Sequence, residues 1–104
     1  LKRVAPTKAP QDDWFVDQAS KSVRFKENEI DLTIYEFSVF HLLFNSPGRI
    51  YTREQIIEFA FQHRDVSDRA IDSHIKNIRK RIKTAGIEET IIESVYGAGY
   101  RFKK

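Results

Sequence analysis

The first third of the chain alternates apolar and polar residues over three short stretches. These stretches, residues 14–18, 21–25 and 28–32, place apolar side chains at every second position and are separated by polar turn residues. A period of two is typical of strands that bury one face. The pattern therefore predicts a small antiparallel sheet over residues 14–32.

Two capping boxes mark the starts of the next two predicted elements, which are helices. Thr33 is followed three residues later by Glu36, and Thr52 by Gln55, and such pairs satisfy free N–H groups in the first turn of a helix. Residues 46–48, Ser-Pro-Gly, end the first helix. Its apolar positions recur at helical spacing and are Phe37, Phe40, Leu43 and Phe44. The second helix is expected to reach about Phe61, with its core-facing positions at Ile56, Ile57 and either Phe59 or Ala60.

The third predicted helix, residues 67–84, has one apolar side and one charged side. At about 100° per residue, its four isoleucines fall within roughly 60° of one another. These isoleucines are Ile71, Ile75, Ile78 and Ile82. The opposite side gathers Arg69, Ser73, Lys76 and Lys80. Ser67 or Asp68 is expected to cap its start, and Gly86 to end it.

Positive charge is concentrated on this helix. Residues 67–84 contain six Lys and Arg against two Asp, a net charge of +4, while the whole chain carries +3. A positive field concentrated on one rigid element indicates a surface that binds a polyanion. The same charge spread evenly over the chain would indicate only its solubility. A solvated helix face is the alternative interpretation.

The end of the chain has the pattern of a β-hairpin. Residues 90–95 and 100–104 are rich in strand-forming residues, and the Gly97 and Gly99 between them permit the positive φ of a tight turn. Three helices followed by a hairpin predict an α+β winged helix-turn-helix, with an N-terminal antiparallel sheet and a C-terminal β-hairpin wing. In this fold the third helix enters a major groove of DNA and the wing lies beside it.

Several short motifs occur along the chain in a specific order. They are Leu32-Thr33 with Glu36-Phe37, Pro47-Gly48, Tyr51 to Gln55, Asp68-Arg69 with Asp72, His74-Ile75, Arg79, and Val95 to Phe102. Their order and spacing resemble the DNA-binding effector domain of OmpR/PhoB-type response regulators, from about residue 14 to the end. We expect residues 1–13 to be an interdomain linker and residues 14–104 to be this domain.

The resemblance implies further structure and partners. It implies a four-stranded N-terminal sheet, a receiver domain N-terminal to this chain whose phosphorylation activates the protein, and a head-to-tail dimer on directly repeated DNA half-sites. It also implies that RNA polymerase contacts the loop between the second and third helices. That loop is formed by Gln62, His63, Arg64, Asp65 and Val66.

Three residues on one side of the third helix are predicted to read base edges, since they lie in its first three turns. They are Ala70, Ser73 and Asn77. Asn pairs bidentately with adenine, Ser donates or accepts at a base edge, and Ala contacts a thymine methyl group. For Asn77 the alternative is a residue that caps or hydrates an exposed helix face. Family members often carry a basic residue at that position.

The other predicted DNA contacts lie on the phosphates and in the wing. The predicted phosphate contacts are Arg53, Arg69, His74, Lys76 and Lys80. The resemblance favours this role for His74, for which a packed or surface imidazole is the alternative. The wing residues are Ser94, Tyr96, Gly97, Gly99 and Arg101. Several family members carry Arg in place of Tyr96, and for Tyr96 the alternative is simple packing.

Composition argues against several kinds of site. The chain has no Cys, and none of its three His lies at i, i+4 from another, so no metal site is expected. No Ser, His and Asp set stands in a catalytic motif, so we assign no reaction and no cofactor. No apolar run exceeds three residues, which predicts no membrane span. The lack of Cys is compatible with a reducing cytoplasm.

Two other uses of the basic helix stay open at this point. It would also suit a protein-interaction module that docks an acidic partner. RNA is a weaker alternative, because side chains reach the narrow major groove of an A-form duplex poorly. A steep loss of affinity with salt would distinguish DNA, because bound DNA releases condensed counterions.

Overall fold

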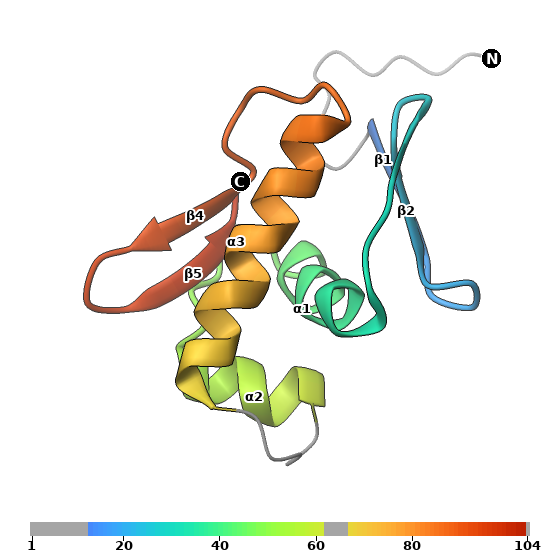
Figure 1. Cartoon of the computed structure of the whole chain (residues 1–104). Coiled ribbons are helices and arrows are strands. Elements are labelled where there is room, and N and C mark those ends of the chain that lie inside the picture. Colours follow the sequence, from blue (N-terminus) through green and yellow to red (C-terminus); the bar gives the residue numbers. More distant parts are fainter. Residues whose placement is uncertain (1–12, 62–66, 104) are drawn as a thin grey trace, which may run out of the picture.

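Three strands, three helices and a hairpin follow one another in the computed structural model, which describes residues 13–61 and 67–103 (Figure 1). The elements are β1 (Trp14–Asp17), β2 (Ser22–Phe25), β3 (Asn28–Ile30), α1 (Ile34–Phe44), α2 (Arg53–Phe61), α3 (Asp68–Thr84), β4 (Ile92–Val95) and β5 (Gly99–Phe102). This order confirms the predicted α+β winged helix. Among the described residues, no helix is long and apolar enough to cross a membrane.

The N-terminal sheet is antiparallel in the order β1-β2-β3. Val16 pairs with Val23, and Val23 pairs with Ile30. Val23 and Ile30 are buried, as the alternation predicts. The resemblance implied four strands here, whereas the described part of the chain contributes three to this sheet. Residues 1–12 lie outside the described part.

Both predicted capping boxes are formed. Thr33 Oγ1 accepts a hydrogen bond from the Glu36 N–H (3.1 Å), and the Thr33 N–H donates to Glu36 Oε1 (3.0 Å). Thr52 and Gln55 make the same reciprocal pair at the start of α2, with both distances at 3.0 Å. In α3 the cap is Ser67, whose hydroxyl accepts from the Ala70 N–H (3.3 Å). These bonds fix where each helix begins.

The core lies between α1, α2 and α3 and extends to both sheets. All four isoleucines of α3 are buried, as the one-sided pattern predicts. The rings of Trp14, Phe40 and Phe102 meet with centroids 5.2–6.0 Å apart and so join β1, α1 and β5. In α2 it is Ala60 that packs against the core, since 47% of Phe59 is exposed. Figure 1 shows α3 between the β4–β5 hairpin on one side and α1 with the N-terminal sheet on the other.

The wing is fastened to the segment before α2. Tyr51 and Tyr100 exchange backbone hydrogen bonds of 2.8 and 2.9 Å, so β5 pairs on both of its edges. Gly97 lies in the hairpin turn with φ +76°. The prediction that Gly99 also serves the turn was incomplete: it is the first residue of β5, and a Cβ there would lie 2.0 Å from the Tyr51 carbonyl oxygen. Close approach of two backbones therefore requires glycine at position 99.

Candidate nucleic-acid interface

The exposed side of α3 carries cations that the fold leaves available. Arg69, Lys76 and Lys80 are exposed, and none forms an ion pair or a side-chain hydrogen bond with another described residue. Ser73 lies among them and is also exposed. Since the isoleucines of the same helix are buried, α3 presents a positively charged outer face on a rigid support.

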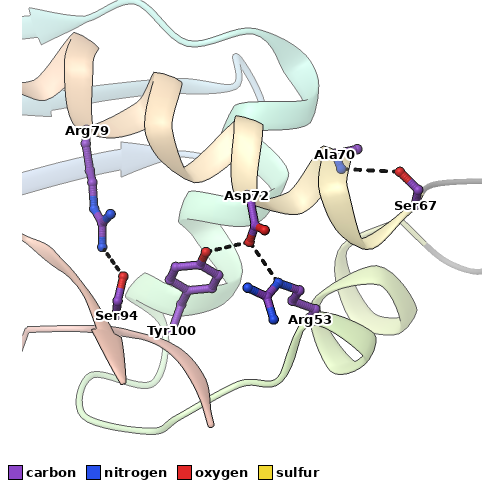
Figure 2. Close-up of polar contacts among 7 residues, drawn as sticks. All are labelled: Arg53, Ser67, Ala70, Asp72, Arg79, Ser94 and Tyr100. Atoms are coloured by element: carbon purple, nitrogen blue, oxygen red, sulfur yellow. Dashed lines mark hydrogen bonds and ion pairs between the residues drawn. The ribbon is translucent and has the colours of Figure 1, made fainter. Parts of the chain in front are cut away.

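One cation of α3, Arg79, makes hydrogen bonds within the protein. The Arg79 guanidinium donates from Nε (3.0 Å) and Nη2 (2.8 Å) to the Ile92 carbonyl, and from Nη2 to Ser94 Oγ (2.9 Å). Arg79 therefore ties α3 to β4, and with it the predicted wing residue Ser94 (Figure 2). In the sequence, Arg79 stood among the cations of the third helix and among the residues of the family resemblance, with no contact predicted for it. Its helical-wheel position beside the isoleucines is the signal from which an inward-reaching side chain could have been predicted.

A second tie joins α2, α3 and the wing at one carboxylate oxygen. Asp72 Oδ1 lies 2.8 Å from Arg53 Nε and accepts a 2.6 Å hydrogen bond from the Tyr100 hydroxyl (Figure 2). Hydrogen bonds from Arg53 and then Tyr100 lower the pKa of Asp72, while burial and the bond to Asp72 raise the pKa of Tyr100. Arg53, a predicted phosphate contact, is thus held by an acidic neighbour.

The opposite flank of α3 contains the other predicted contacts. His74 is half-buried, with ring centroids 6.0 Å from Tyr35 and 5.8 Å from Phe61, so its imidazole packs against aromatic rings. Asn77 is exposed and makes no hydrogen bond to another described residue, while Ala70 is half-buried. Asn77 borders a hollow that is also lined by Glu29 and Asp31 and by the cations Lys80 and Arg81. Negative charge therefore lies next to the later turns of α3.

At the wing, one predicted residue is free and another is paired. Tyr96 is fully exposed (103%), so the alternative that it merely packs is wrong. Arg101 Nε lies 2.7 Å from Glu93 Oε1, across the β4–β5 pair. Between the wing turn and the start of α2 lies a hollow of about 610 Å³, lined by residues 52–54 and 94–100. Arg53 and Tyr96 both line this hollow and therefore lie on the same side of the molecule.

Comparison with known proteins decides the family. Residues 27–102 match the family described as "Transcriptional regulatory protein, C terminal". The chain belongs to this family. BaeR of Escherichia coli O6:H1, a transcriptional regulatory protein, is 36% identical over 89 residues, which are 85% of this chain and 37% of BaeR. PhoB of Klebsiella pneumoniae, a phosphate regulon transcriptional regulatory protein, is 32% identical over 88 residues, 84% of this chain and 38% of PhoB. The resemblance to OmpR/PhoB-type effector domains is thereby confirmed, and the chain spans less than two fifths of these relatives.

Solved structures agree with this assignment. The DNA-binding domain of the response regulator AdeR, solved in complex with an intercistronic region, matches with a TM-score of 0.78 and 25% identity, covering 88% of this chain and 95% of that one. The RstA DNA-binding domain of Klebsiella pneumoniae, solved with the RstA box, has a TM-score of 0.73 at 22% identity, over 88% and 91% of the two chains, and shows the shared fold.

Some of the predicted residues are not placed by the structure. The proposed polymerase-contacting residues 62–66 lie outside the described part of the chain. Among the described residues, no group of three His, Cys, Asp or Glu is arranged to hold a metal ion. The base, phosphate and wing assignments of this effector domain stay predictions.

Proposed function

We propose that this effector domain binds double-stranded DNA sequence-specifically and so regulates transcription, as the output domain of a two-component response regulator. The α3 helix would lie in the major groove, with the β4–β5 wing beside it. The observation that carries the proposal is the outer face of α3, where Arg69, Lys76 and Lys80 are exposed and have no acidic partner among the described residues. The AdeR DNA-binding domain, which has the same fold, was solved in complex with an intercistronic region.

The remaining parts of the proposal follow the family resemblance. We propose a receiver domain N-terminal to this chain, joined through a linker at residues 1–13 and controlled by phosphorylation. Binding would occur as a head-to-tail dimer on direct-repeat half-sites, with the loop at residues 62–66 in contact with RNA polymerase. A protein-interaction module that docks an acidic partner remains the alternative for the same basic helix.

The first prediction concerns the phosphate contacts. Lys80→Ala should weaken binding to selected and to random duplexes alike, because a phosphate contact carries no sequence information. The slope of log K against log salt should fall by about 1, since one fewer counterion is released. Fluorescence anisotropy over a salt series measures both. Lys26→Ala, in the β2–β3 turn, is the matched control and should leave the slope unchanged; a loss confined to the selected duplex would reject the assignment.

The second prediction concerns specificity. Asn77 is exposed and has no hydrogen-bond partner among the described residues, so its amide is free to read adenine. Asn77→Ala should flatten the preference at one base position, by about 1–3 kcal/mol, while affinity for random DNA is kept. Binding to all four bases at each half-site position tests this, with Thr84→Ala in the last turn of α3 as control. Unchanged preference at every position would show that Asn77 is not a reader.

A further inference from the structure

An acidic side chain sits within the face that the proposed function assigns to DNA. Asp72 lies on α3, one turn from Lys76, and its carboxylate is 44% exposed beside Arg53, which is 46% exposed. A carboxylate near a phosphate backbone repels it. On electrostatic grounds alone, Asp72 would therefore lower the affinity of this face for DNA.

The contacts of Asp72 point to a different role. Its Oδ1 atom meets Arg53 Nε from α2 and the Tyr100 hydroxyl from β5, at 2.8 and 2.6 Å. The Tyr100 ring also lies under two guanidiniums, since the Cζ atoms of Arg53 and Arg79 are both 5.9 Å from its centroid. Three elements distant in the sequence thus converge on one carboxylate oxygen (Figure 2).

The geometry holds the Arg53 guanidinium in place and leaves some of its hydrogen-bond donors available. Its Nε donates to Asp72 and the Tyr100 hydroxyl is its other polar neighbour, so further donors of the half-exposed guanidinium stay available. A guanidinium has five donors in a rigid fork that suits a phosphate. An arginine held in place loses less side-chain entropy on binding than a free one. Arg53 also borders the hollow that separates the start of α2 from the wing turn.

We propose that Asp72 is a positioning residue for DNA binding: its carboxylate holds Arg53 and Tyr100 so that the start of α2 and the wing face the same stretch of backbone. The inference rests on the proposed function. In this role Asp72, an acidic residue, strengthens the binding of DNA, whereas its charge alone would weaken that binding.

The test is whether DNA binding becomes weaker or tighter when the Asp72 carboxylate is removed. Asp72→Ala and Glu54→Ala each remove one negative charge from this region, and Glu54 lines the same hollow without an ion pair to another described residue. Repulsion alone makes both variants bind a mixed-sequence DNA duplex more tightly. We expect Asp72→Ala to bind about three- to tenfold more weakly, and Glu54→Ala to bind equally or up to about threefold more tightly.

A double-mutant cycle separates positioning from mere stability. If Asp72 acts largely through Arg53, then Asp72→Ala should have little further effect in an Arg53→Ala background. Thermal unfolding of each variant shows how much of the chain is folded during the binding measurement. Should Asp72→Ala not fold, Tyr100→Phe, which keeps the packed ring and removes only the hydroxyl, should still weaken binding about twofold or more.

The outcomes distinguish this inference from the function on which it rests. A wild-type chain that shows no salt-dependent binding to duplex DNA would overturn the proposed function itself. A wild-type chain that binds, with an Asp72→Ala variant that folds and binds equally or more tightly, would overturn only the positioning role. The positioning role would also be overturned if the losses of DNA-binding free energy from Arg53→Ala and Asp72→Ala simply added in the double variant. Unchanged DNA binding by Tyr100→Phe would overturn it as well.

Discussion

Replacing Gly99 with Val is expected to detach the wing and to lower the free energy of unfolding by about 3 kcal/mol or more. A Cβ at position 99 would lie 2.0 Å from the Tyr51 carbonyl oxygen and 2.8 Å from its carbonyl carbon, and φ is +145°. Both obstacles are backbone atoms, so no side-chain rotation relieves the clash. DNA affinity should fall with the wing displaced. Urea denaturation and anisotropy measure the two effects.

Gly97→Val is the matched comparison for this variant. Gly97 lies two residues away with φ +76°, but an added Cβ would meet nothing within 4 Å. Its cost is confined to backbone strain, about 1–2 kcal/mol. Equal losses in the two variants would show that strain in the hairpin, and not the approach to Tyr51, makes glycine necessary at position 99.

Ile78→Ala should destabilise the domain by about 2–5 kcal/mol, because it leaves a cavity where α3 packs on the core. The Ile78 side chain is 0% exposed, so both its burial and its contacts are lost. The free energy of unfolding from urea denaturation measures the change. Ile34→Ala removes the same atoms at a position that is 66% exposed, and should shift the free energy by no more than about 0.5 kcal/mol. Similar losses at both sites would contradict the assigned core.

Local sequence patterns anticipated most of the fold. The capping boxes at Thr33 and Thr52 and the cap at Ser67 are made by residues three positions apart, so their spacing can be read from the sequence. The spacing of the α3 isoleucines likewise fixed which side of that helix is buried. These signals lie within single elements, and the structure confirms them.

The contacts between elements were not anticipated. Glu36 was expected to complete a capping box, and it does, but it is also buried with its Oε1 2.8 Å from Arg81 Nε of α3. The partners of Asp72 and Arg79 are similarly 13 to 28 residues away in the sequence. Periodicity reports which side of an element is buried, but it does not say which side chain of another element will lie opposite. The ties between α2, α3 and the wing therefore required the structure.

Selection of bound duplexes from a random DNA library tests the central claim, sequence-specific binding of duplex DNA through α3, most directly. If α3 reads bases, the bound pool should become enriched in one short sequence, and Asn77→Ala should lose preference at a single position of it. A direct repeat of that sequence at a fixed spacing would further support the head-to-tail arrangement. Recovery of duplexes with no shared sequence, at an affinity equal to that of the starting library, would contradict sequence-specific recognition by this domain.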